Sequence, residues 1–233
     1  QLLAQAPNNV SYQNNLALIQ RWREKPELSE SNLSQLNGVE PIDQATRINH
    51  MQNSQALSNI QDWKAQNADL MQRAPLDTGV QLSQKELNDH NRATIQHQTT
   101  FSKSKSDSRD LLGQLKGSRE RDHQTRLNSP WFSDNYRAYA THNYRWSDFD
   151  DGEVDDSRIG LGLEWASKRK HASIAISQAT DGDRLGAELE WSHWLNDHWN
   201  YHVGYNSQAN IPLQAVKDGF EGKSYAVGVD WQQ

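Results

Sequence analysis

From Trp131 to the C-terminus, apolar and polar residues alternate one by one in a series of short runs. Strict alternation is the pattern of a β-strand with one apolar and one polar face, because successive side chains point to opposite faces. Clusters of Gly, Asp, Asn or Lys, which favour turns, bound each run. This half of the chain is therefore predicted to form antiparallel strands joined by turns. The clearest runs are 137–147, 158–167, 171–179, 184–194, 199–207 and 225–231.

The apolar faces of these strands end in Trp or Tyr in most runs. A soluble β-sandwich also alternates, but it buries Val, Leu and Phe in a packed core, whereas aromatic residues at strand ends are typical of the interfacial girdle of a membrane barrel. We therefore favour an outer-membrane barrel, with lipid as the partner of the apolar faces. The residues predicted to face lipid are Ile159, Leu161, Leu163, Leu185, Leu189, Val203, Val227 and Val229, and the girdle residues are Trp165, Trp191, Trp199 and Trp231.

The connections between runs alternate between long and short, as they do in bacterial barrels. The acidic stretch 147–157 and the segment 208–223 are interpreted as long external loops, and 168–170 as a tight turn. Two weaker strands at 92–101 and 121–132 bring the count to about eight. Eight strands can close into a barrel filled by its own side chains, so a small closed barrel acting as an adhesin or anchor remains an alternative. The glycines on the polar face favour an open pore.

Composition is compatible with a membrane protein of this kind. Mean hydropathy is -0.98 and no run of about eighteen apolar residues occurs, which argues against a transmembrane helix, but alternating barrel strands would leave this average unchanged. The chain has no Cys, so disulfides and thiolate sites are absent. It begins with Gln1 and lacks the features of a signal peptide, from which we expect a fragment of a longer protein.

An internal repeat marks the first 90 residues. Pro7, Pro41 and Pro75 stand 34 residues apart, and a Leu precedes each by five residues, at Leu2, Leu36 and Leu70. This is the period of tetratricopeptide repeats, in which Pro ends the second helix of each pair. Apolar residues keep helical spacing between these marks, although the Gln and Asn content leaves disorder as an alternative. The predicted stripes are Tyr12, Leu16, Ile19 and Trp22, and Leu57, Ile60, Trp63 and Leu70.

Several segments resemble the PgaA-type porins, which export poly-β-1,6-N-acetyl-D-glucosamine across the Gram-negative outer membrane. They are SDNYRAYATHNYRW (133–146), IGLGLEWASK (159–168) and the long stretch from Leu195 to Gln232 that contains IPLQAVKDGFEGKSY, with the linker 72–95 resembling the family's last repeat helix and first strand. The resemblance implies a barrel of roughly sixteen strands, periplasmic repeats, and a role in biofilm polysaccharide export. It also implies that the repeats dock a periplasmic polysaccharide N-deacetylase.

The predicted fold is therefore α + β. Residues 1–90 are expected to be TPR-like helical repeats at the C-terminal end of a longer array, and residues 91–233 to be the N-terminal half of an outer-membrane β-barrel, about eight of roughly sixteen strands. A soluble repeat scaffold that binds a protein is the other alternative. Detergent-dependent solubility of the C-terminal half distinguishes it from the membrane interpretations.

The predicted function is transport rather than catalysis. Partly deacetylated poly-N-acetylglucosamine carries ammonium groups, which carboxylates on the polar face would attract. The predicted conduit residues are Glu164, Glu188, Glu190, Asp230 and Tyr139, the last through stacking on sugar rings; ordinary hydrophilic lining and girdle packing are the alternatives. Glu188 and Glu190 have the spacing of a glycosidase pair, but both would project into water. No catalytic residue, metal site or cofactor is expected, and the acidic second half argues against nucleic acid as a partner.

Overall fold

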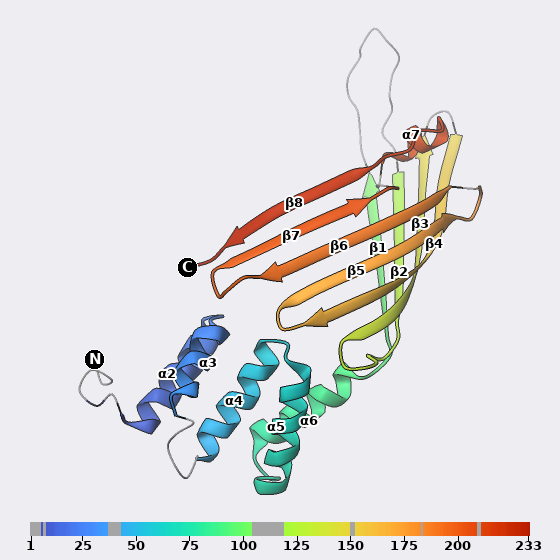
Figure 1. Ribbon diagram of the computed structural model, residues 1–233. Coiled ribbons are helices and arrows are strands. Elements are labelled where there is room, and N and C mark those ends of the chain that lie inside the picture. Colours follow the sequence, from blue (N-terminus) through green and yellow to red (C-terminus); the bar gives the residue numbers. More distant parts are fainter. Residues whose placement is uncertain are drawn as a thin grey trace.

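The computed structural model describes residues 6, 8–36, 43–103, 119–149, 152–182, 184–208 and 211–233. Helices at one end of the molecule precede a long curved sheet, in the order predicted (Figure 1). The helices are α2 (Val10–Trp22), α3 (Pro26–Ser34), α4 (Gln44–Ala56), α5 (Ile60–Arg73), α6 (Thr78–His90) and the short α7 (Leu213–Lys217). The strands are β1 (Thr94–Lys103), β2 (Arg119–Asn128), β3 (Tyr136–Phe149), β4 (Gly152–Ser167), β5 (Lys170–Ala179), β6 (Leu185–Trp194), β7 (Trp199–Asn206) and β8 (Ser224–Trp231).

The helices follow a 34-residue interval that the Pro and Leu spacing anticipated. Helices α2, α4 and α6 begin at Val10, Gln44 and Thr78, and each is preceded by a side-chain cap, Asn9, Asp43 or Asp77. Each cap oxygen accepts a hydrogen bond from a backbone N–H in the first helical turn, which satisfies a donor that would otherwise lack a partner. Pro75 lies just beyond the end of α5, as predicted. Leu2, Pro7 and Pro41 lie outside the described residues.

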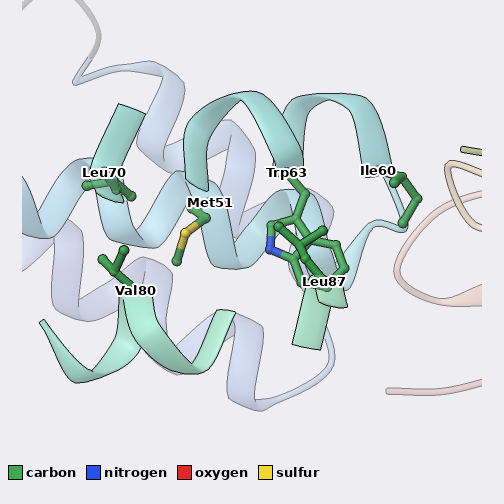
Figure 2. Close-up of a cluster of buried hydrophobic side chains, with 6 residues drawn as sticks. All are labelled: Met51, Ile60, Trp63, Leu70, Val80 and Leu87. Atoms are coloured by element: carbon green, nitrogen blue, oxygen red, sulfur yellow. The ribbon is translucent and has the colours of Figure 1, made fainter. Parts of the chain in front are cut away.

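Apolar contacts hold α4, α5 and α6 together (Figure 2). Trp63 is buried, and its indole N–H donates to Ser83 Oγ of α6 at 2.7 Å. The predicted Leu70 is 1% exposed and Leu36 is 4% exposed in a second, smaller cluster. The larger cluster consists of Met51, Ile60, Trp63, Leu70, Val80 and Leu87. None of the helices in the described ranges is both long and apolar enough to cross a lipid bilayer.

The apolar stripe predicted for α2 is wrong in part. Ile19 is 50% exposed and Trp22 is 74% exposed, whereas Asn14 and Ala17 are buried. The face of α2 that meets α4 is polar: Asn14 Nδ2 donates to Thr46 Oγ1 at 2.8 Å, and Arg21 donates to Asn49 and Asn53. Because buried amides and hydroxyls replace part of the apolar packing here, hydropathy alone misplaced the buried face.

The sheet pairs its strands in sequence order, β1 to β8, with every neighbouring pair antiparallel. Within the described residues β1 and β8 are not paired with each other, so the small closed barrel considered from the sequence is not formed. All eight predicted strands are present, which confirms the strand count. The predicted tight turn after β4 consists of Lys168 and Arg169, both with positive φ, the geometry of a two-residue hairpin turn.

The acidic stretch 147–157, by contrast, is not a long loop. Strands β3 and β4 extend through it and pair as far as Phe149 and Gly152. Asp156 lies within β4, is 4% exposed, and accepts hydrogen bonds from Arg145 and Arg184. Cross-strand pairing and ion pairs therefore order a segment whose charge suggested a solvated loop; Asp150 and Asp151 lie outside the described residues.

Candidate functional site: the inner face of the sheet

The two faces of the sheet have different chemistry, and we call the face that carries Glu164 the inner face. Glu164 is paired laterally with Ser173 of β5, and Ser173 is paired with Glu190 of β6, so the three lie in one row. Glu188 is paired with Ala175 and Asn206. Asp230 is paired with Asn200, which is paired with Trp194. The register thus places all four predicted carboxylates on one face.

Glu188, Glu190 and Asp230 hydrogen bond mainly to neutral groups. Asn206 Nδ2 donates to Glu188 and Ser173 Oγ donates to Glu190, both at 3.2 Å. Asn200 Nδ2 donates to Asp230 at 3.1 Å, and His202 lies 3.5 Å from the same oxygen. In the described part of the chain no Lys or Arg forms an ion pair with these three carboxylates. These three carboxylates are therefore held by fewer charged partners than the carboxylate of Glu164.

Glu164 differs from the other three because cationic side chains surround its carboxylate. Arg126 donates to Oε2 at 2.7 Å, Arg137 donates to Oε2 at 2.8 Å and to Oε1 at 3.0 Å, and His171 lies 2.9 Å from Oε1. The Glu164 side chain is only 7% exposed. Glu164 is thus on the predicted face, but its partners join β2, β3, β4 and β5, which favours a structural role over contact with polymer.

Tyr139 also lies on the inner face but is 7% exposed. Its ring covers Gly162, where an added Cβ would approach the ring to 2.3 Å, so only glycine fits beneath it. The guanidinium of Arg126 lies over the same ring, 3.7 Å from its centroid. Gly228 is covered by His202 in the same way. Gly162 and Gly228 therefore accommodate rings from neighbouring strands rather than leaving open space, and Tyr139 is poorly placed to stack on a sugar.

A recess of about 190 Å³ opens on the inner face beside Glu188. Its lining mixes carboxylates, amides and guanidinium groups, among them Asp122, Asn143 and Arg158. Glycosidase chemistry needs two carboxylates with opposed environments, and Glu190 on the same strand is not part of this lining. A recess of this mixed polarity suits contact with the hydroxyl and amide groups of a carbohydrate.

The segment 211–222 lies against the inner face at the end of the sheet away from the helices (Figure 1). Helix α7 contacts β3 and β4, and Leu213 is 7% exposed. Arg145 Nη1 donates to the Ile211 carbonyl at 2.7 Å, while Nη2 of the same residue donates to Asp156 at 2.8 Å. The segment 211–222 therefore folds over the inner face and covers part of it at this end.

The opposite face carries the apolar residues predicted to meet lipid. All of them are exposed, from 40% for Val203 to 80% for Val227. The register sets Leu163, Ile174 and Leu189 side by side and continues to Tyr205 and Tyr225. In the next row Trp165 and Trp191 stack with ring centroids 6.1 Å apart. An exposed apolar band of this size, edged by Trp, is the surface that a barrel presents to lipid.

Contacts between the helices and the sheet were not predicted from the sequence. Asp197, in the turn between β6 and β7, accepts hydrogen bonds from the backbone N–H groups of Glu27 and Leu28 at 3.1 and 2.8 Å. These two N–H groups lie in the first turn of α3 and have no partner within the helix. The N-cap residue of α3, Lys25, forms no side-chain cap to them. Arg169 Nη1 donates to the same carboxylate at 2.7 Å. Burial and the nearby Asp197 raise the pKa of Glu27.

Two further contacts fix the helices to the sheet. The rings of His90 and Trp131 stack with centroids 5.2 Å apart, and the Arg137 guanidinium lies over the same indole, 4.7 Å from the ring centroid. Lys64 of α5 forms an ion pair with Asp134 in the turn before β3. The sequence contained only a weak signal for this junction, because Lys168-Arg169-Lys170 and LNDH (195–198) have the composition of ordinary turns.

Comparison with known proteins agrees with this architecture. A family model described as the PgaA membrane beta barrel domain matches residues 78–233, from the start of α6 through β8. Two curated relatives, from Escherichia coli strain K12 and from Escherichia coli O157:H7, are each named poly-beta-1,6-N-acetyl-D-glucosamine export protein. Each is 25% identical over 238 residues, and the alignment covers all of this chain but 28% of the relative. No significant match to a solved structure was found.

Proposed function

The chain belongs to the PgaA membrane β-barrel family, and on this premise we propose that its sheet forms part of the wall of an outer-membrane pore that exports poly-β-1,6-N-acetyl-D-glucosamine. One observation carries the proposal: a single antiparallel sheet presents an apolar, Trp-edged face on one side and hydrogen-bonded polar groups on the other. Such a sheet separates lipid from a hydrophilic conduit. The two curated relatives of this chain carry the name poly-beta-1,6-N-acetyl-D-glucosamine export protein, which supports the proposal.

The charge on the inner face favours a polymer that carries some ammonium groups. Glu188, Glu190 and Asp230 lower the free energy of a cation that passes them, and several weak sites favour movement over retention. In this proposal Glu164 and Tyr139 hold the wall in shape, since both are buried among their partners. A conduit of this kind fits partly deacetylated polymer better than the neutral form.

The proposal is tested by polymer secretion from cells that express the full-length parent protein. The variant Glu188→Gln, Glu190→Gln, Asp230→Asn should lower secretion several-fold. Each single change should have a small effect, because it leaves two of the three weak sites in place and water screens each charge. The matched control is Asp148→Asn, Glu153→Gln, Asp155→Asn, which removes the same charge from exposed residues at the far end of β3 and β4. Equal secretion by both variants would leave a pore without preference for cations.

We further propose that the helices lie in the periplasm and bind the polysaccharide N-deacetylase that acts before export. A pocket of about 430 Å³ on the helices supports this part, with Glu30, Arg47, His50 and Asp69 in its lining. Hydrogen bonds from His50 and Asn53 keep the pKa of Glu30 low despite the opposing effect of burial, so this carboxylate stays charged. Binding of purified deacetylase by titration calorimetry should weaken for Arg47→Glu but not for the exposed Lys85→Glu. Equal affinity would place the deacetylase elsewhere.

A further inference from the structure

The junction between the helices and the sheet contains a pocket of about 520 Å³. Ala56 and Ser58, where α4 leads into α5, line it from the helical side. His171, Ser192 and Trp194 line it from the sheet. Its volume lies within the range of pockets that bind small ligands. We propose that this junction pocket binds a short stretch of the exported polymer, one or two sugar units, between the helices and the inner face; the inference rests on the function proposed above.

The pocket is continuous with the inner face of the sheet. Ser192 and Trp194 follow Glu190 at alternate positions of β6, so all three side chains belong to the same face. His171 stands two residues before Ser173 on β5 and hydrogen bonds to Glu164. Ligand in the pocket therefore lies next to the row that contains Glu164, Ser173 and Glu190. A polymer that leaves the helices at this point meets the inner face without crossing the apolar one.

The lining has the mixture of groups that a sugar requires. A pyranose ring has an apolar C–H face and a rim of hydroxyl, amide or ammonium groups, so it binds best where an aromatic ring is surrounded by hydrogen-bonding side chains. Trp194 supplies the ring, with the Arg169 guanidinium 4.6 Å from its centroid on one side. Glu24 and Ser192 supply acceptors. The donors come mainly from Arg21, Arg169 and Lys170, so the lining suits the hydroxyl and acetamido groups of N-acetylated units rather than ammonium groups.

Direct bonds between the two parts hold the walls of the pocket in place. Lys168 N–H, in the β4–β5 turn, donates to the Ser58 carbonyl at 3.2 Å. Asp197 ties the β6–β7 turn to α3 and to Arg169, and Gln232 Nε2 donates to the Asp197 carbonyl at 3.0 Å. Walls fixed before the ligand arrives lose little entropy on binding, which lets a small contact area retain useful affinity.

The test is calorimetric binding of a partly acetylated β-1,6-linked glucosamine hexamer to the purified full-length protein in detergent. Ala56→Trp fills the pocket from the helical side, and Trp194→Ala removes its aromatic ring. Each should weaken binding about tenfold or more, in line with loss of one well-packed contact of about 1.4 kcal/mol. The matched controls are Ala68→Trp on the exposed surface of α5 and Trp199→Ala on the outer face, which should bind as the parent does.

Unchanged affinity in both pocket variants would overturn the proposal. So would weaker binding by Trp194→Ala alone, because Trp194 would then act only by supporting Arg169 at the junction. Polymer secretion measured on the same variants separates this inference from the proposed function. If the parent protein secretes polymer but the pocket variants bind the hexamer as well as the parent does, only the pocket proposal is contradicted. If the hexamer binds in the pocket but the parent protein secretes no polymer, the proposed export function is contradicted.

Discussion

At the scale of single residues, the carboxylate of Glu164 is bound by Arg126, Arg137 and His171. Removing its charge should lower the free energy of unfolding. Glu164→Gln leaves these cationic groups facing an uncharged amide. A buried pair broken in this way costs about 3–5 kcal/mol. We expect about 2 kcal/mol, because the two Arg side chains are 33% and 24% exposed and water compensates them in part.

Urea unfolding of the full-length protein in lipid vesicles measures this effect, with Glu190→Gln as the control. Glu190 is exposed and its carboxylate accepts one hydrogen bond from Ser173, so its change should cost less than about 1 kcal/mol. If Glu164→Gln were as stable as the control, the ion cluster would not contribute to the wall, and Glu164 would again be a candidate for polymer contact.

Leu189 tests which face of the sheet meets lipid. It is 46% exposed and lies in the apolar row between Ile174 and Tyr205. An Arg at the middle of a lipid-facing strand costs about 2–4 kcal/mol, so Leu189→Arg should lower the stability of the full-length protein in bilayers by that amount. Ala226→Arg, on the inner face beside Gly204, is the control and should be nearly neutral. Equal destabilisation by the two variants would show that the faces are assigned wrongly.

The sequence alone could assign residues to faces but not to partners. Alternation within a strand fixes which side chains share a face, and the eight predicted apolar residues all lie exposed on one side. Alternation carries no information about what stands opposite in the next strand. The positions of Tyr139 over Gly162 and of Glu164 beside Arg137 depend on the register between β3 and β4. The burial of both residues among protein groups could therefore not be predicted from the sequence.

At the scale of elements, the stacking of His90 at the end of α6 on Trp131 makes one attachment of the helices sensitive to pH. Burial lowers the pKa of His90 below its ordinary value of 6.5, and Lys64 and Arg137 lower it further. The detached state therefore takes up a proton at higher pH than the attached state does. The attachment is complete above about pH 6.5 and should weaken as the pH falls through the lowered pKa.

The measurement uses a full-length variant in which Trp131 is the only Trp left where the helices meet the sheet. Its fluorescence should change between pH 7.5 and pH 5 as the contact with His90 weakens. His90→Phe keeps a ring against Trp131 and has no titratable group, so its signal should be independent of pH over the same range. A parent signal that does not change, or a His90→Phe signal that changes equally, would contradict a role for His90 protonation. Burial against Trp131 could not be predicted from sequence, since 40 residues separate the two positions.

Element boundaries illustrate which physical signals a sequence carries. Local chemistry set the helix starts, because each cap residue bonds to an N–H three positions or fewer away, and the 34-residue interval repeats Asn9, Asp43 and Asp77. The hairpin at Phe149 and Gly152 was missed because its stability comes from pairing between strands rather than from local propensity. The buried face of α2 was missed because polar side chains form it through hydrogen bonds: Asn14 is buried and Arg21 is half-buried.

At the scale of the whole molecule, contacts between distant parts of the sequence decide how the helices meet the sheet. Asp197 bonds to the backbone of Glu27 across 170 residues, and the alternation of the strands gave no indication of this contact. The sequence predicted both parts and their order, but not the junction pocket between them. Trp191 and Trp194 are three residues apart on β6 and therefore lie on opposite faces of the sheet. Trp191 is on the outer face, whereas Trp194 is on the inner face beneath Arg169.

The inward-folded segment 211–222 leads to the last prediction, which concerns passage through the whole pore. Arg145 holds this segment by donating to the Ile211 carbonyl, and Asp156 fixes the guanidinium in position. Arg145→Ala removes this hydrogen bond and leaves Asp156 bound to Arg184, so the wall keeps one ion pair while the segment keeps only the weaker hold that includes the packing of α7 and Leu213. Because the segment covers part of the inner face, its release should raise the single-channel conductance of the full-length protein in planar bilayers about twofold or more, an increase equivalent to roughly 0.4 kcal/mol in the barrier to ions. Asn143→Ala, two residues away on the same strand and face, is the control; an increase of the same size in Asn143→Ala, or none in Arg145→Ala, would show that the segment does not limit passage.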